Sequence, residues 1–85
     1  MRITEPFLQS LNFKTNNCNI NKNYYHLYYT RDNIETVYDP IDDIWETKYK
    51  NSNTLLMCKT NNQNIFKLFV ILCENIDKNE YTKDI

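Results

Sequence analysis

Apolar and polar positions alternate through the middle of the chain, with the two-residue period of β-strands that have one buried face. Short polar segments rich in Asp and Asn interrupt this alternation and predict tight turns between the strands. The predicted strands are residues 24–30, 34–38, 44–50 and 54–59. The last strand is the most apolar of the four, so we expect it at the centre of the sheet.

A short helix is expected before the strands. Thr4 is placed as its N-cap, and Glu5 and Pro6 suit the first helical turn. The helix should fade by Phe13. The polar, Asn-rich residues 14–23 then predict a loop.

A second, longer helix is expected after the strands. Thr60 and Gln63 have the T-x-x-Q spacing of a capping box, with Thr60 as the N-cap. Apolar residues then recur every three or four positions, as on one face of a helix. This stripe consists of Ile65, Phe66, Leu68, Phe69, Leu72, Cys73 and Ile76. Residues 77–85 are charged and predict a frayed tail.

These elements predict a single α+β domain spanning residues 1–85. Its order is an N-terminal helix, a four-stranded antiparallel meander and a C-terminal amphipathic helix packed on one sheet face. The other sheet face would be open to solvent or to a partner. One local alternative stays open, because Asp39-Pro40 followed by two acids is also typical of a helix start, which would make residues 40–49 a short helix. Trp45, Thr47 and Tyr49 favour the strand.

The composition excludes several classes of protein. The chain has no glycine, so phosphate-binding loops and dinucleotide fingerprints are excluded, and tight turns must rely on Asn and Asp. The net charge of −1 is untypical of a nonspecific nucleic-acid binder, which is usually basic. Glycine and alanine are absent while Asn, Ile, Lys and Tyr are abundant, which indicates an AT-rich genome.

Cysteine usage and hydropathy predict a cytoplasmic protein. The three cysteines lie far apart and form no C-x-x-C motif, which is typical of reduced thiols. The N-terminus has no apolar segment of the kind found in secretion signals. The longest apolar run, residues 68–73, is too short to cross a membrane.

Catalysis and metal binding have weak support. The only histidine, His26, lies between tyrosines on a predicted strand, and Cys58 and Cys73 occupy apolar settings where thiols are usually inert. Cys18 falls in the predicted loop, and the three cysteines lack the paired spacing of a zinc site. We therefore expect no enzyme activity, cofactor or metal. At this length a binding module is favoured.

An acidic segment is the best candidate for a binding surface. Residues 31–46 hold six acids and one base. They are either solvated turns or a patch that docks on the basic groove of a protein partner, with the chain's only Trp as anchor. The candidate contact residues are Asp39, Asp42, Asp43, Trp45 and Glu46.

Tyr24 and Tyr28 form a second candidate surface. On an open sheet face, flanked by lysines, they could stack on single-stranded nucleic acid. Tyrosines on a strand also pack across to neighbouring strands, and that interpretation stays open.

The chain resembles small proteins encoded by phages and prophages of AT-rich bacteria, Bacteroidetes especially. The resemblance rests on ITEPFLQSLNF, on aromatic strands such as YYHLYYTRD followed by a Trp-bearing hairpin, and on NNQNIFKLFVIL. It implies a non-enzymatic inhibitor of a host defence nuclease, namely an anti-CRISPR protein acting on a type VI-B effector, an RNA-guided nuclease that cleaves RNA. No family motif transfers a role to any residue of this sequence. The alternative function is a small nucleic-acid-binding accessory protein of a mobile element.

Overall fold

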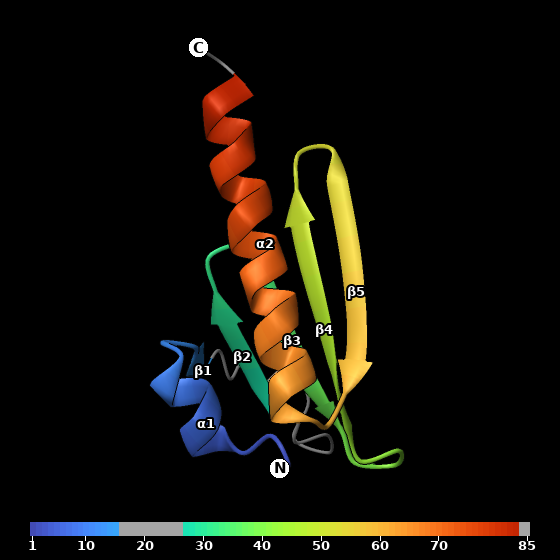
Figure 1. The fold of residues 1–85 in the computed structure, drawn as a ribbon. Helices are drawn as coiled ribbons and strands as arrows, with labels where there is room; N and C mark the ends of the chain where they lie inside the picture. Colours follow the sequence, from blue (N-terminus) through green and yellow to red (C-terminus); the bar gives the residue numbers. More distant parts are fainter. Residues whose placement is uncertain (16–26, 84–85) are drawn as a thin grey trace.

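The computed structural model describes residues 1–15 and 27–83, with side chains as far as residue 79. Five strands form one antiparallel meander in which every strand pairs with its neighbour in sequence (Figure 1). The two helices cover one face of this sheet. The elements are α1 (Glu5–Ser10), β1 (Lys14–Thr15), β2 (Tyr28–Arg31), β3 (Ile34–Asp39), β4 (Ile44–Asn51), β5 (Thr54–Thr60) and α2 (Gln63–Lys83). The predicted α+β architecture is confirmed, with five strands where we expected four.

Helix α1 begins where the sequence predicts. Thr4 is the N-cap, and its hydroxyl accepts a hydrogen bond from the backbone N–H of Phe7 at 3.2 Å. Pro6 occupies the first turn, where no backbone donor is needed. The helix ends at Ser10, and Asn12 then turns the chain with a positive φ of 68°.

Strand β1 was not predicted. Lys14 and Thr15 pair with Thr30 and Tyr29 of β2, so the expected loop does not begin at residue 14. A strand of two residues is too short to show an alternation of apolar and polar positions. It forms here because it pairs with the edge of β2. The remainder of that loop, and Tyr24 to His26 of the predicted strand, lie outside the described residues.

The segment that could have been a helix is a β-hairpin. Residues 40–43 form the turn, and β4 follows as an eight-residue strand. Trp45, Thr47 and Tyr49 share its buried face, opposite Tyr38, Thr36 and Ile34 of β3. The alternation of apolar and polar positions therefore decided the local structure.

Strand β5 lies at the edge of the described sheet, so its predicted central position is wrong. Leu55 and Met57 explain the error, because both point away from the helices and remain exposed. The alternate residues, Leu56 and Cys58, face the helix layer and are half-buried. The high apolar content of β5 thus comes from both of its faces.

Helix α2 begins two residues later than predicted. Asn62 is its N-cap, with the side-chain oxygen accepting from the N–H groups of Asn64 at 2.9 Å and Ile65 at 3.1 Å. The Thr60 hydroxyl instead accepts from the Asn62 N–H in the preceding turn. The predicted Thr60 cap is therefore wrong, and Gln63 donates its side-chain amide to the Arg2 carbonyl.

The helix continues beyond residue 76, and polar contacts hold it to the sheet as far as Asp77. The Tyr49 hydroxyl donates to Asp77, and Asn51 donates to the same carboxylate at 3.0 Å. Arg31 of β2 pairs with Glu74 at 2.8 Å. Residues 77–83, placed in the predicted tail, are thus helical; the fraying of the tail stays a prediction, and residues 84–85 lie outside the described ones.

The core lies between the sheet and the helices. Phe66 is at its centre, 5.9 Å from the Phe7 ring and 5.5 Å from the Phe13 ring between centroids. The buried apolar residues are Ile3, Leu8, Phe13, Tyr29, Ile34, Trp45, Tyr49, Phe66, Phe69, Val70 and Cys73. The opposite sheet face is left uncovered by either helix (Figure 1).

Candidate functional site

The β3–β4 turn presents an apolar side chain between acids. The Asp39 carboxylate accepts hydrogen bonds from the backbone N–H groups of Ile41 at 2.9 Å and Asp42 at 3.4 Å. These bonds fix the turn, since an Asp side chain here replaces a backbone acceptor. Ile41 is 91% exposed, and Asp42 beside it is also exposed.

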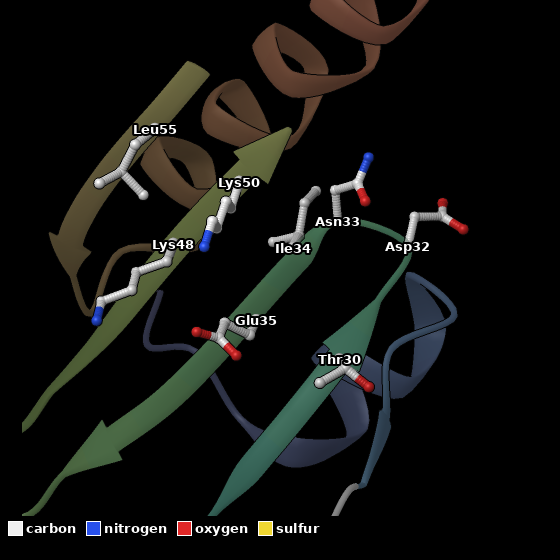
Figure 2. Close-up of a pocket in the computed structure, with 8 residues that line it drawn as sticks. All are labelled: Thr30, Asp32, Asn33, Ile34, Glu35, Lys48, Lys50 and Leu55. Atoms are coloured by element: carbon white, nitrogen blue, oxygen red, sulfur yellow. The ribbon is translucent and has the colours of Figure 1, made fainter. Parts of the chain in front are cut away.

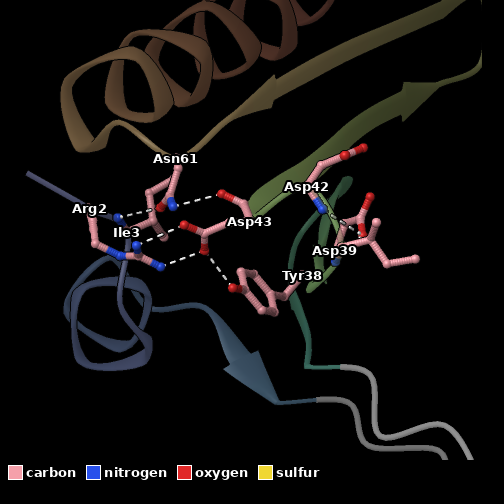
Figure 3. A network of polar contacts seen from close by, with 8 residues as sticks. Arg2, Ile3, Tyr38, Asp39, Asp42, Asp43 and Asn61 are labelled. Carbon is pink, nitrogen blue, oxygen red and sulfur yellow. Dashed lines mark hydrogen bonds and ion pairs between the residues drawn. The ribbon is translucent and has the colours of Figure 1, made fainter.

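Asp43 ends this turn and ties it to the chain's N-terminus (Figure 3). Its carboxylate receives two hydrogen bonds from the Arg2 guanidinium, at 2.8 and 2.5 Å, and one from the Tyr38 hydroxyl at 2.5 Å. Asn61 donates to the Asp43 carbonyl at 2.8 Å. The hydrogen bond from Tyr38, followed by those from Arg2, lowers the pKa of the Asp43 carboxyl below its usual 3.8. The Asp43 carboxylate therefore has its hydrogen-bond partners within the molecule and stabilises the fold.

Trp45 does not belong to the surface. It is 2% exposed and packs in the core, with its ring 5.2 Å from Tyr38 and 6.1 Å from Tyr29 between centroids. An anchor for a partner must be accessible in the free protein, so the assignment of Trp45 as a contact residue is wrong. Ile41 is the exposed apolar residue of this region, and it is not among the contact residues predicted from the sequence.

The six acids of residues 31–46 do not gather into one patch. Asp32 lies at the other end of β3 from the β3–β4 turn, 3.7 Å from the Arg31 guanidinium. Glu46 points to the open sheet face, where Lys59 is 3.6 Å away. With Asp43 paired to Arg2, the acids of the turn without a cationic partner among the described residues are Asp39 and Asp42.

Tyr28 lies on the open sheet face, as its alternation with Tyr29 predicts. It is half-buried, and its hydroxyl donates a hydrogen bond to Glu35 on β3. Tyr28 therefore packs across to the neighbouring strand. Tyr24, its expected companion, lies outside the described residues.

The open sheet face also carries a shallow hollow of about 430 Å³ (Figure 2). Lys48 and Lys50 of β4 line it beside Glu35, so its walls combine both signs of charge. The full lining consists of Thr30, Asp32, Asn33, Ile34, Glu35, Lys48, Lys50 and Leu55. Two ammonium groups beside exposed backbone turns could contact phosphates.

The two described thiols are protonated at neutral pH. Burial raises the pKa of Cys73 to about 11, with the nearby Asp77 carboxylate adding to the shift, and burial also raises the pKa of Cys58. Such thiols are poor nucleophiles. Among residues 1–15 and 27–83, no three His, Cys, Asp or Glu side chains converge as metal ligands, and no helix is long and apolar enough to cross a membrane. Cys18 and His26 lie outside the described residues.

Helix α2 carries four exposed apolar residues, three of which belong to the stripe predicted to face the sheet. Ile65, Leu68, Ile71 and Leu72 are between 49% and 66% exposed, whereas Phe66 and the other buried residues of the helix face the sheet. The predicted stripe is therefore wrong for Ile65, Leu68 and Leu72. We call these four exposed residues the outer surface of α2. The signal was present in the sequence, because residues 65–73 hold more apolar side chains than one helix face can bury.

Comparison with models of protein families, with curated proteins and with solved structures found no match to this chain.

Proposed function

We propose that this protein is a non-enzymatic binding protein that inhibits a host defence nuclease. The observation that carries this proposal is the outer surface of α2, where four apolar side chains stay about half exposed along one helix. A helix that is apolar on both sides is typical of one that is covered on both sides. Contiguous exposed apolar side chains mark sites of protein association more often than isolated ones do.

The partner proposed is an RNA-guided nuclease of the type VI class, which cleaves RNA in the cytoplasm of the bacterial host. This choice rests on the resemblance to small phage and prophage proteins. Binding would interfere with guide RNA or with target engagement. Since those sites of the nuclease must be basic to hold RNA, acids on the inhibitor would speed the encounter.

The acidic turn is the second contact in this proposal. Ile41 takes the place that Trp45 cannot fill, and Asp39 and Asp42 supply the negative charge. Asp39 holds the backbone of the turn that presents Ile41. A turn whose backbone is already ordered loses little conformational freedom on binding.

The experiment is an RNA cleavage assay with purified type VI-B effector, guide RNA and this protein. Leu68→Lys should abolish inhibition, because it places a charge in the middle of the outer surface of α2. Leu68→Met is the matched control, since it keeps the size and apolar character of the side chain, and it should inhibit like the wild type. Equal inhibition by Leu68→Lys and the wild type would remove the outer surface of α2 from the proposal.

A pulldown from host lysate, with and without digestion of nucleic acid, tests the partner class. Recovery of a large nuclease after digestion supports direct binding. Ile41→Lys should then reduce recovery at physiological salt, and Asp42→Lys should act in the same direction mainly by slowing association. Failure to recover any nuclease, together with no effect on RNA cleavage, would refute the proposal.

The alternative function, nucleic-acid binding through the open sheet face, is favoured by Lys48 and Lys50 beside the hollow. It predicts that the isolated protein shifts single-stranded RNA at low salt and releases it as salt increases. Lys48→Ala with Lys50→Ala should weaken this shift, and Leu68→Lys should leave it unchanged. Leu68→Lys therefore tests nuclease inhibition, and the double lysine variant tests nucleic-acid binding.

A further inference from the structure

Strand β5 is a long edge strand with few of the features that usually protect an edge. It has seven residues, it contains no proline, and Lys59 is its only charged residue. Native edges are commonly short, charged, bulged or covered, because their free backbone groups can pair with another strand. Among the described residues none pairs with the outer side of β5.

The hydrogen-bond pattern of the sheet identifies the free backbone groups. Along an antiparallel strand, residues direct their N–H and C=O groups alternately to one neighbouring strand and to the other. The Lys50 N–H donates to the Asn33 carbonyl, so Lys50 is directed to the β3 side. The next residue, Tyr49, is then directed to β5, where it is opposite Leu56.

The register of β4 and β5 completes the assignment. Since Leu56 is directed inward to β4, the residues that alternate with it are directed outward. These are Leu55, Met57 and Lys59. Their backbone N–H and C=O groups form a row along the outer side of β5, with Met57 at its centre.

We propose that a second copy of this chain pairs antiparallel with β5, around a two-fold axis at Met57. In this register Met57 is opposite Met57 of the second copy, and Leu55 is opposite its Lys59. Every outward residue of each copy then faces an outward residue of the other. The two meanders become one continuous sheet.

The side chains of β5 suit this self-pairing. A two-fold axis at Met57 keeps the two Lys59 ammonium groups apart and places each beside a leucine, so no like charges are opposed. Leu55 and Met57 are 62% and 55% exposed and would be covered across the joined strands. On the other face, the half-buried Leu56 would lie opposite Cys58 of the second copy. The side chains of β5 are therefore compatible with a second copy of β5 as the pairing strand.

The flank of α2 that faces β5 extends this apolar edge. Arg31 and Phe7 contact Glu74 and Lys67, which places that flank of the helix toward β2 and α1. Ile65 and Leu72 lie on the opposite flank, toward β5, and both remain about half exposed. The contact consists of one strand edge and one helix flank, and small contacts of this kind are typical of weak complexes. We therefore expect a dissociation constant in the micromolar range.

The test is the mass of the intact chain in solution, measured by light scattering and sedimentation at about 100 µM, where a micromolar complex is populated. The wild type should have twice the 10.4 kDa mass of one chain. Met57→Pro removes a backbone N–H that is directed outward, so no bond inside the sheet is lost, and proline is tolerated in edge strands at such positions. This variant should be a monomer with the circular dichroism of the folded protein.

Two controls separate strand pairing from other contacts. Met57→Ala keeps the backbone donor and should dimerise at least tenfold more tightly than Met57→Pro. Leu68→Lys changes the outer surface of α2 and should leave the dimer intact. Hydrogen exchange should show protection of the Met57 amide that increases with protein concentration.

A monomeric wild type at this concentration would overturn the proposal. A dimer that survives Met57→Pro, or that is lost in Leu68→Lys, would also overturn it, because the contact would then lie elsewhere. Ile65 and Leu72 belong to the outer surface of α2 and also flank the proposed strand contact. The inhibition assay is therefore read with Met57→Pro, which changes no residue of α2 and should inhibit like the wild type.

Discussion

Replacing Trp45 by alanine distinguishes a core residue from a binding anchor. Trp45 is 2% exposed and packs against two tyrosine rings, Tyr38 and Tyr29. Truncating a buried Trp or Phe to alanine costs about 3–5 kcal/mol, because the transfer energy is lost and a cavity remains. A chain of 85 residues has a free energy of unfolding of roughly 4–13 kcal/mol. The variant should therefore lose a large share of the free energy of unfolding, and at the lower end of that range it would be largely unfolded.

The assay is urea unfolding followed by far-ultraviolet circular dichroism, since the variant has no tryptophan fluorescence. A loss of 3 kcal/mol or more lowers the thermal midpoint by at least about 12 °C for a domain of this size. Trp45→Phe is the control, because it keeps an aromatic ring beside Tyr38 and should cost much less. The same samples should be tested for partner binding at a temperature where both remain folded.

One result would refute this reasoning. If Trp45→Ala unfolds within about 1 kcal/mol of the wild type but loses its partner, the indole is accessible in the functional state. The protein would then need a second conformation in which β4 exposes its inner face. If the free energy of unfolding falls as expected, weak binding by the variant says nothing about contact.

Three further predictions follow from other parts of the structure. The hydroxyls of Thr36 and Thr47 are buried and 2.9 Å apart, so either Thr→Val change alone should cost about 1–3 kcal/mol, whereas the double variant should be nearly as stable as the wild type in urea unfolding. Asp43 has a lowered pKa in the folded chain, so its contribution to stability is present above the unfolded pKa and is lost as the pH falls through the folded value; Asp43→Asn should flatten the loss of stability below about pH 4 in acid titrations. Cys58 and Cys73 have raised pKa values, so both should react slowly with a thiol reagent at pH 8 and rapidly after unfolding, which a timed absorbance assay with and without denaturant will measure.

The order of elements could be predicted because each depends on local signals. Alternation along 34–38 and 44–50 is long enough to define strands, and Thr4 and Pro6 mark the start of α1. The same alternation could not show which face of the sheet the helices cover. Trp45 was therefore assigned correctly to one face of β4, and the wrong consequence was drawn for its exposure.

The errors in the sheet have a common physical cause. Whether a strand lies at the centre or the edge depends on pairing with distant segments, and hydrophobicity alone does not determine it. Leu55 and Met57 make β5 apolar without burying it, because they face the open side. The contact between Arg2 and Asp43 spans 41 residues of sequence, and no local pattern of charges indicates it. The outer surface of α2 has a different cause, since residues 65–73 hold more apolar side chains than the face toward the sheet can bury.

The acidic segment shows how the absence of glycine changes what a charge pattern means. A chain without glycine must place other residues in the left-handed region, and Asn and Asp do so at the lowest cost. The three described residues with positive φ are indeed Asn12, Asp32 and Asp43. Two of the six acids are therefore accounted for by backbone geometry, and Asp39 is accounted for by the bonds that hold its turn. In such a sequence, acids at turns are weak evidence for a binding patch, and the exposed Ile41 is the more informative residue of this region.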